Sequence, residues 1–176
     1  MKRFLEAYGK DMEFCQIQLN YLDWDFQGAK AKVQLLEEYG IPVWVMEPLR
    51  GGRLASLEEK YEEKLKALRP QESIPAWAFR FLQSLPSVKV VLSGMSTMEQ
   101  LKENIATFEE DKPLSSQEEK ELLGMADEMV KKIALPCTAC HYCVSHCPQE
   151  LDIPSLLALY NEHCFSDGGF IAPMVV

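Results

Sequence analysis

Four cysteines lie close together near the end of the chain, in the segment "CTACHYCVSHCP". They are Cys137, Cys140, Cys143 and Cys147, and the whole chain contains six cysteines. Thiols gathered in this way can form disulfides, hold a zinc ion or bind an iron–sulfur cluster. The N-terminal "MKRFLEAYGKDMEF" has two basic residues but no apolar stretch after them, so it does not resemble a secretion signal. We therefore expect a cytoplasmic protein, whose reduced thiols bind a metal rather than form disulfides.

The spacing of these cysteines distinguishes between the metals. CxxCxxCxxxCP is the ligand pattern of bacterial ferredoxins, in which closely spaced thiolates surround a 4Fe-4S cluster. A structural zinc site typically has two ligand pairs that are separated by a dozen or more residues. The pattern therefore favours the cluster, and zinc, disulfides or unliganded thiols are the alternatives. His141 and His146 could act as zinc ligands, but we interpret them as solvated loop residues beside the metal.

A single run of this kind leaves the fourth ligand of the cluster open. In two-cluster ferredoxins the last cysteine of one run binds the other cluster, and this chain has only one run. We predict Cys147 as the fourth ligand, with Cys164 or an external group as the alternative. A lone cysteine such as Cys164 is more typical of a small buried hydrophobic residue. Cys15 lies on the apolar face of a predicted strand, and we interpret it as core packing.

The composition excludes several classes of partner. The 18 Lys and Arg residues are outnumbered by 27 Asp and Glu residues, which gives a formal net charge of -9. Nucleic acids and anionic membranes are bound largely through clustered basic residues, so we expect neither as a partner. No apolar run reaches the roughly 18 residues that cross a bilayer. Small molecules or other proteins are the expected partners.

The first two thirds of the chain alternate short strands with helices, which predicts parallel βα units. The predicted strands are "FCQIQLNY" (14–21), "VWVMEPL" (43–49) and "VKVVLSG" (88–94). The first strand alternates strictly, so that one face carries apolar side chains and the other carries the amides of Gln16, Gln18 and Asn20. We therefore expect helices against one face of the sheet and polar groups on the other.

Helices are predicted between and after these strands. Apolar residues at helical spacing precede Gly40, a natural helix end, and two further helices are predicted over 56–69 and 73–84. Ser96 and Glu99 predict a capping box for a helix whose apolar stripe is Met98, Leu101, Ile105 and Phe108.

The pattern changes after residue 112. A helix is predicted from Ser115 or Ser116 to about Lys132, followed by the cysteine segment and a last helix in "IPSLLALYNEH". The predicted division is therefore 1–112 for the βα units, 113–135 for a helical connection and 136–176 for the cluster segment.

Three segments together resemble a known family. "FCQIQLNYLDWD", "GIPVWVMEPLRGGRLA" and "VKVVLSGMSTMEQLKENI", in this order and followed by the cysteine run, resemble the end of an aldo/keto reductase with a ferredoxin-type iron–sulfur extension. The resemblance implies an α/β fold: the last three units of a TIM (βα)8 barrel, then a small α-helical 4Fe-4S ferredoxin-type segment. It also implies an oxidoreductase that transfers hydride from NADP(H) or NAD(H) to a small-molecule carbonyl, with an electron-transfer protein as a possible partner of the cluster.

The resemblance also implies a set of cofactor contacts. Gln16 corresponds to the amide that contacts the nicotinamide carboxamide, although a barrel-interior polar residue is the alternative. A loop over the pyrophosphate is implied at Glu47, Leu49, Gly51 and Gly52, where a plain βα turn would also favour glycine. Phosphate and adenine contacts are implied at Ser93, Gly94, Met95, Ser96, Gln100, Glu103 and Asn104. Many family members have tyrosine at Met46 and arginine at Gln100, so the choice between NADP and NAD stays open.

No catalytic residue is implied in this chain. The family's catalytic tyrosine, lysine, aspartate and histidine come from the first four strands, and this sequence begins just before the sixth. We therefore expect the isolated chain to be inactive and to self-associate through the open edges of its sheet. The alternative hypotheses are a non-catalytic 4Fe-4S electron-transfer or interaction module and a zinc-stabilised structural protein.

Overall fold

The computed structural model describes residues 1–133, 135, 137 and 141–164. It divides into two compact units, Met1–Asp127 and Glu128–Val176, which are described separately below. No helix in the described part of the chain is both long enough and apolar enough to span a membrane.

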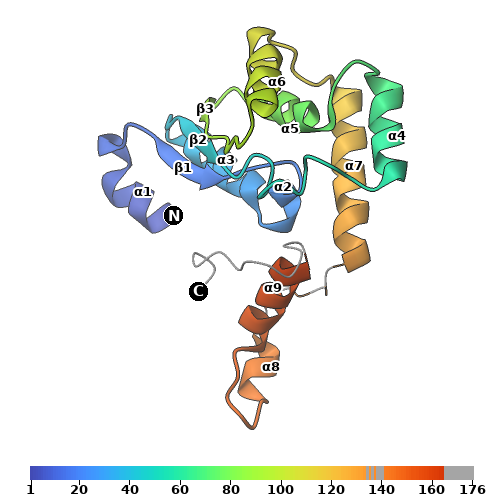
Figure 1. Ribbon diagram of the computed structural model, residues 1–176. Helices are drawn as coiled ribbons and strands as arrows, with labels where there is room; N and C mark the ends of the chain where they lie inside the picture. The colour runs from blue at the N-terminus through green and yellow to red at the C-terminus, as the bar shows by residue number, and fades with distance from the viewer. Residues whose placement is uncertain (134, 136, 138–140, 165–176) are drawn as a thin grey trace. The chain divides into compact units, whose positions relative to one another are not determined.

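The first unit is built on a parallel sheet of three strands in the order β1-β2-β3 (Figure 1). The strands are β1 (Cys15–Gln18), β2 (Val43–Met46) and β3 (Val88–Val91). The helices of this unit precede, connect and follow the strands, and their bounds are α1 (Lys2–Tyr8), α2 (Asp23–Phe26), α3 (Ala29–Glu38), α4 (Glu59–Leu68), α5 (Ile74–Gln83) and α6 (Met98–Glu109). A 3-10 helix, η1 (Gly9–Asp11), follows α1, and α7 (Ser116–Ile133) begins in this unit. The predicted alternation of strands and helices is therefore confirmed.

The sheet has one buried and one open face. Ile17 is paired with Val45, and both side chains are buried. On the opposite face Gln16 is paired with Trp44, and neither is buried. Neighbouring residues in a parallel register point to the same side of the sheet, so the apolar residues of β1 and β2 share one face. This is the arrangement that the alternation in "FCQIQLNY" predicts.

Helix α5 supplies three of the largest side chains of the core. Ser73 caps its N-terminus, because the Ser73 hydroxyl oxygen accepts a hydrogen bond of 3.4 Å from the Ala76 amide, and proline lies in the first turn. Its Trp77, Phe79 and Phe81 are almost completely buried. Full burial of such aromatic side chains stabilises the fold by about 2–3 kcal/mol each.

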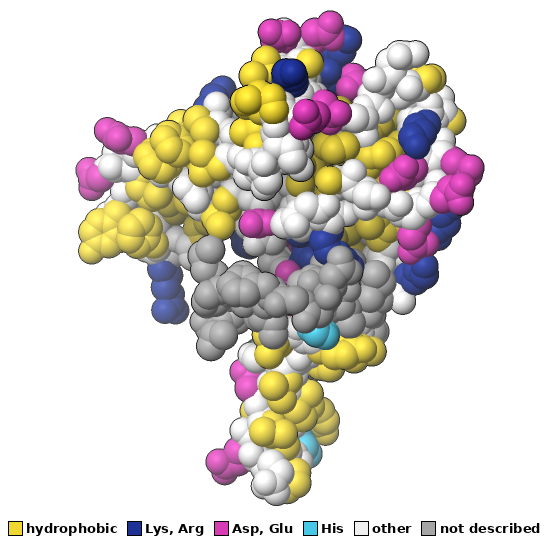
Figure 2. All heavy atoms as spheres, viewed as in Figure 1, with side chains coloured by type: hydrophobic (Ala, Val, Ile, Leu, Met, Phe, Trp, Pro, Cys, Tyr) yellow, Lys and Arg dark blue, Asp and Glu magenta, His cyan; other side chains and the backbone are white. Residues whose placement is uncertain are grey.

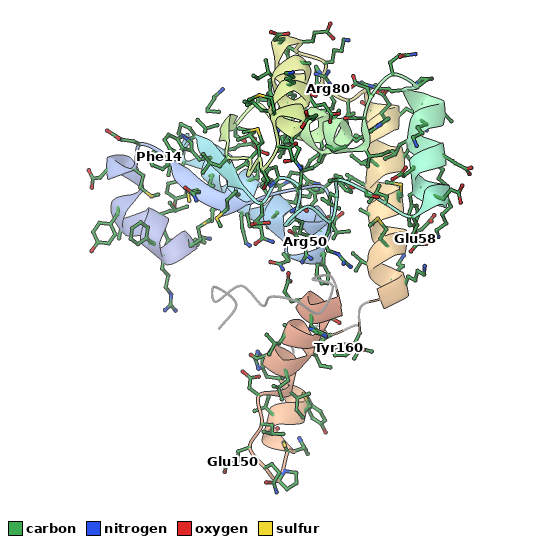
Figure 3. All side chains as sticks on the ribbon, in the orientation of Figure 1. Phe14, Arg50, Glu58, Arg80, Glu150 and Tyr160 are labelled. Carbon is green, nitrogen blue, oxygen red and sulfur yellow. The ribbon has the colours of Figure 1, made fainter. Side chains whose placement is uncertain are left out.

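A buried arginine joins α5 to the end of α6. The Arg80 guanidinium is 3% exposed and donates to the Thr107 carbonyl at 2.8 Å and to the Glu110 carbonyl at 2.6 Å. These carbonyls lie at the C-terminus of α6, where a cation also interacts favourably with the helix dipole. Glu72 accepts a third hydrogen bond from Arg80 at 3.3 Å. Arg80, labelled in Figure 3, thus fixes the position of α6 relative to α5.

Local conformation differs from the sequence prediction at several places. The strands are shorter than predicted, and β2 ends at Met46 because Glu47 takes a positive φ of 56°. Gly28, with a φ of 62°, separates the predicted first helix into α2 and α3. The capping box of α6 is formed by Thr97 and Gln100 rather than by Ser96 and Glu99. That prediction was wrong by one residue, because Ser96 instead donates its amide to the Gln100 side chain.

The apolar stripe of α6 is largely exposed, although its spacing predicts a core-facing side. The exposed fractions are 59% for Met98, 51% for Ile105 and 43% for Phe108. In the viewed face of the molecule, hydrophobic side chains gather over α6 and over α1 (Figure 2). Within the described residues, β1 and β3 each pair with β2 alone. Both edges of the sheet are therefore open, as expected for three strands of a larger barrel.

The second unit contains the end of α7, the cysteine segment and two helices. These are α8 (Tyr142–Ser145) and α9 (Ile153–Cys164), and the latter confirms the last predicted helix. The Asn161 side chain joins α9 to the segment that precedes the cysteines: its oxygen accepts from the Leu135 amide at 2.7 Å and its nitrogen donates to the Leu135 carbonyl at 2.9 Å. This double hydrogen bond satisfies both backbone groups of Leu135.

Candidate functional site: a pocket at the strand ends and a cysteine segment

A pocket of about 240 Å³ lies where β2 and β3 end. It is formed by the loop after β2 (residues 47–55, the β2–α4 loop), the turn after β3 (residues 92–97, the β3–α6 turn) and the first half of α6. Of the cofactor residues proposed from the sequence, the pocket lining includes Glu47, Leu49, Gly51, Gly52, Ser93, Gly94, Met95, Gln100, Glu103 and Asn104. Gln16 and Ser96 are not part of this lining. The structure thus brings together residues that are up to 57 positions apart, from Glu47 to Asn104.

The β2–α4 loop has an unusual backbone. Glu47 and Arg50 have positive φ values of 56° and 49°, and Gly51 and Gly52 have values of 64° and 93°. Left-handed conformations cost a residue with a side chain about 1–2 kcal/mol, so Glu47 and Arg50 must be held in place by other interactions. A Cβ atom added at Gly52 would meet no atom within 4 Å. The two glycines therefore leave backbone accessible from the pocket, where a ligand can approach closely.

A buried polar network holds this loop against the end of β1. The Asn20 amide donates to the Glu47 carbonyl at 2.9 Å and to the Asp23 carboxylate at 2.8 Å. The Arg50 guanidinium donates to the same carboxylate at 3.0 Å, and it lies near α2 in Figure 3. The exposed fractions of Asn20, Asp23 and Arg50 are 0%, 1% and 6%. The network therefore binds both positive-φ residues of the loop, Glu47 through its carbonyl and Arg50 through its side chain.

Three further contacts belong to the network. Gln18 donates to the Asp23 carboxylate at 2.8 Å, and the Arg50 guanidinium lies 5.9 Å from the centre of the Phe26 ring. The Asp23 amide donates to the Asn20 side-chain oxygen at 2.9 Å, which is a local turn motif. The sequence prediction did not include Asn20, Asp23 or Arg50 among the site residues. The Asn-x-x-Asp spacing could have indicated the turn, but no sequence signal identifies Arg50 as the partner of Asp23.

The β3–α6 turn is fixed by side chains of α6. Asn104 donates to the Ser93 hydroxyl at 3.3 Å. The Gln100 side-chain oxygen accepts from the amides of Ser96 at 2.7 Å and Thr97 at 3.2 Å. The backbone amide of Gln100 in turn donates to the Thr97 hydroxyl at 3.2 Å. Of the backbone amides proposed to face a phosphate, that of Ser96 is thus already used by the helix cap.

Gln16 lies outside the pocket lining, on the open face of the sheet. Its side chain is exposed, and its amide nitrogen is 3.5 Å from the Met46 sulfur. Nearer the start of the same strands, Phe14 stacks on Trp44 with ring centroids 3.8 Å apart. In a closed barrel this face would point to the interior. A contact between Gln16 and a nicotinamide ring would therefore have to form on the face of the sheet that points to the barrel interior.

A second pocket, of about 420 Å³, lies between α5, β3 and α6. It is lined mainly by apolar residues such as Leu82, Val88 and Phe108, with Lys89 and Asp111 among the charged ones. None of the proposed cofactor residues belongs to its lining. Although larger, it lies along the open side of β3 rather than at the strand ends where barrel sites form.

Two of the cysteines are associated with α8. Cys143 lies within this helix and Cys147 follows it, with the Cys147 amide donating to the Val144 carbonyl at 3.2 Å. Both are half-buried and Cys137 is exposed, and Cys140 lies outside the described residues. Among the described side chains, no group of three or more His, Cys, Asp or Glu residues is arranged to hold a metal.

The two histidines of the cysteine segment lie at its surface, as the sequence predicts. His141 and His146 are exposed, and a His146 ring nitrogen lies 3.0 Å from the Tyr142 carbonyl oxygen.

Cys15, the cysteine on β1, is half-buried, and burial raises the pKa of its thiol. A raised pKa keeps this thiol protonated and poor as a metal ligand.

Comparison with known proteins decides the family. The model of the "Aldo/keto reductase family" matches residues 2–126, well over half of the chain. The chain belongs to the aldo/keto reductase family. The match ends before the cysteine segment, so it concerns the sheet, its helices and the pocket. A search of curated proteins found no match.

Solved aldo/keto reductases share the fold of this chain. The aldo-keto reductase AKR11C1 from Bacillus halodurans, in its holo form, is 21% identical with a TM-score of 0.56, over 70% of this chain and 45% of that one. The thermostable aldo-keto reductase Tm1743, in complex with the inhibitor epalrestat, is 24% identical with a TM-score of 0.50, over 62% of this chain and 38% of that one. The chain thus spans less than half the length of these reductases. The three-stranded sheet is part of a TIM-barrel-like fold, and the α/β fold prediction is confirmed to that extent.

Proposed function

We propose that this chain forms the nucleotide-binding part of an aldo/keto reductase that reduces a small-molecule carbonyl with NADP(H) or NAD(H). The pocket at the ends of β2 and β3 is the observation that carries the proposal, because residues proposed from sequence alone converge there. The site also agrees with the rule that barrel enzymes bind ligands at the C-terminal ends of their strands.

The size and lining of the pocket fit part of a dinucleotide. Ligand pockets usually have volumes of about 300–1,000 Å³, and this one, at about 240 Å³, is smaller. In our proposal, Gly51 and Gly52 bring backbone next to the pyrophosphate, and Glu103 and Asn104 offer polar groups to the adenine. Gln16 would contact the nicotinamide from the open face of the sheet. A bound nicotinamide supplies the hydride, and the residues of this chain bind and orient it.

We assign no catalytic residue to this chain. Reduction of a carbonyl requires an acid that protonates the developing alkoxide. Tyr21 does not suit this role, because its side chain is 1% exposed on the core side and burial raises the pKa of its hydroxyl further above its ordinary value. The Lys89 ammonium donates to the Pro86 carbonyl at 2.8 Å near the start of β3, away from the strand ends. In our proposal the acid comes from the other strands of the complete barrel.

Oxidation of the nicotinamide, followed at 340 nm with a panel of aldehydes and quinones, tests the activity. We expect no turnover above background from the isolated chain. Addition of the first five strands of the barrel, in the same polypeptide or as a second one, should restore activity that depends on their catalytic tyrosine. Turnover by the chain alone would show that it has an active site of its own.

We also propose that residues 136–176 bind a 4Fe-4S cluster, connected to the reductase part (1–112) by 113–135. The cysteine spacing supports Cys137, Cys140, Cys143 and Cys147 as the ligands. Cys143 lies within α8, and Cys147 follows two residues after the end of this helix. The cluster would exchange electrons with a protein partner.

Metal analysis after purification without air tests the cluster. We expect a brown protein that contains iron and sulfide, and we expect serine at Cys137, Cys140 or Cys143 to abolish the colour. Cys15→Ser is the matched control and should keep the iron, because Cys15 lies outside the run. If Cys147→Ser retained the iron, the fourth ligand would be Cys164 or an external group instead of Cys147. A colourless protein with stoichiometric zinc would contradict the proposal and favour a zinc-stabilised protein.

A further inference from the structure

One asparagine side chain joins the two ends of the cysteine segment. Asn161 of α9 is 7% exposed, and its side chain accepts from the Leu135 amide at 2.7 Å and donates to the Leu135 carbonyl at 2.9 Å. Leu135 lies two positions before Cys137, and Asn161 lies 14 positions after Cys147. All four cysteines of the ferredoxin-type run therefore lie within the loop that these two hydrogen bonds close.

The hydrogen bonds near Cys147 are local by comparison. The Cys147 amide donates to the Val144 carbonyl at 3.2 Å, and the Glu150 amide donates to the Cys147 carbonyl at 3.1 Å. Each of these spans three positions along the chain, whereas the two hydrogen bonds between Asn161 and Leu135 span 26. The Asn161 side chain thus holds the start of the cysteine segment against the helix that follows it.

Closure of this loop favours the binding of a cluster by its thiols. Four thiolates within eleven positions are a donor set that suits a 4Fe-4S cluster. The chain between the thiolates must lose conformational freedom when they gather around a cluster, and this cost is smaller when the ends of the loop are already held together. A side chain that closes the loop therefore contributes to the affinity for the metal without contacting it.

We propose that Asn161 is a positioning residue for the 4Fe-4S cluster, and that it acts through its two hydrogen bonds to the backbone of Leu135. The inference rests on the proposed function, namely that the four cysteines of the run bind such a cluster. Alanine at position 161 would remove both hydrogen bonds and release the backbone groups of Leu135. The loop would then open, and the chain would release its cluster faster.

Loss of the cluster to an excess of EDTA, followed by the visible absorption of the loaded full chain, tests the proposal. We expect Asn161→Ala to lose its cluster about tenfold faster than the unchanged chain, as when groups that orient metal ligands are removed. Asn161→Gln keeps an amide on a longer side chain and should recover part of this loss. Ser155→Ala is the matched control: it removes a hydrogen bond of 2.7 Å to Asp152 at the start of α9 but leaves the loop closed, so we expect an unchanged rate.

Exchange of the Leu135 amide proton, measured by NMR in the iron-free chain, tests the closed loop independently of the cluster. We expect slow exchange in the unchanged chain and in Ser155→Ala. In Asn161→Ala the amide loses its acceptor, so it should exchange roughly tenfold faster. Fast exchange in the unchanged chain would overturn the inference, because the loop would then be open before the metal binds.

The remaining outcomes separate this inference from the function on which it rests. Equal rates of cluster loss from Asn161→Ala and the unchanged chain would overturn the positioning role and leave the cluster assignment intact. Equally fast loss from Ser155→Ala and Asn161→Ala would also overturn it, because the effect would then come from the stability of α9. An unchanged chain that takes up no iron would overturn the cluster proposal, and this inference with it.

Discussion

Asp23 shows how a single buried residue can support a site that it does not line. Its carboxylate accepts hydrogen bonds from Gln18, Asn20 and Arg50. Through Arg50 and Asn20 it holds the positive-φ residues of the β2–α4 loop, which forms one wall of the pocket. Buried charge networks of this kind are costly when only one partner is removed. The conformation of the loop therefore depends on Asp23.

Substitution of Asp23 by asparagine should release the loop. The new amide cannot accept from all three donors and removes the negative charge that faces the buried Arg50 guanidinium, so we expect the free energy of unfolding to fall by about 3 kcal/mol. Trypsin should then cleave after Arg50 or Arg53 faster than in the unchanged chain. Urea unfolding and timed proteolysis measure the two effects.

The matched control for this prediction is Asp25→Asn. Asp25 is exposed and lies two positions further along α2. We expect this variant to change the free energy of unfolding by less than about 0.5 kcal/mol and to resist trypsin like the unchanged chain. Equal stability and equal cleavage of Asp23→Asn and Asp25→Asn would contradict the role of the network.

At the residue scale, the residues that line the pocket were easier to predict from the sequence than the residues that hold the β2–α4 loop in place. The residues proposed for the cofactor could be named because they lie on or after three strands in a recognisable order. Asn20, Asp23 and Arg50 were missed because their contacts join positions 27 apart and depend on how the loop turns. The alternation of the strand was enough to place Gln16 on a polar face, but it could not predict that Gln16 lies outside the pocket lining.

At the scale of elements, one ion pair fixes the start of α7 to the end of α4. Arg69 binds Glu118 through two hydrogen bonds, of 2.5 and 2.8 Å, and also donates to the carbonyls of Lys112 and Pro113. Both side chains are less than one-fifth exposed. The Arg69 hydrogen bonds are the main cause that lowers the pKa of Glu118 from its ordinary value of 4.5 to about 2.

Stability should therefore depend on pH through Glu118. Because its pKa is lower in the folded chain, its contribution is present above pH 4.5 and is lost as the pH falls towards 2. We expect Glu118→Gln to lower the free energy of unfolding by about 1 kcal/mol at pH 7 and by less at pH 3. Urea unfolding at the two pH values measures the difference.

Glu121→Gln provides the control on the same helix. Glu121 is exposed and accepts from Gln117 one turn earlier. Its replacement should leave both the stability at pH 7 and its pH dependence close to those of the unchanged chain. A Glu118→Gln variant with the same pH dependence as the unchanged chain would disprove the assignment.

The elements themselves were largely predictable, but their ends were not. Hydrophobic periodicity predicted α3, α6 and α9, because each has apolar residues at helical spacing. The capping box of α6 was placed one residue too early, because Ser96 and Thr97 both suit a cap and only the backbone decides between them. Helix α1 was not predicted, since its exposed Phe4 and Tyr8 give no clear core stripe.

At the scale of the whole molecule, the open sheet should drive self-association. The edges of β1 and β3 and the exposed stripe of α6 offer unpaired backbone groups and apolar surface in the described first unit. We expect light scattering to detect oligomers of the isolated chain at micromolar concentration. Ile105→Lys should shift the distribution towards smaller species, because it places a charge within the stripe.

Ala106→Lys adds the same charge at the adjacent exposed position of α6, outside the stripe. We expect it to reduce association much less than Ile105→Lys. A monodisperse monomer of the unchanged chain would mean that another part of the molecule covers the open sheet.

Hydrogen–deuterium exchange in millimolar NAD⁺ tests the central claim most directly, because it locates the ligand as well as detecting it. We predict slower exchange in peptides that cover 47–55 and 92–104, the two sides of the proposed site. Peptides that cover 82–91, which border the larger apolar pocket, should exchange at an unchanged rate. Protection confined to 82–91 and 108–111, or no protection in either region, would contradict the assignment of the nucleotide site.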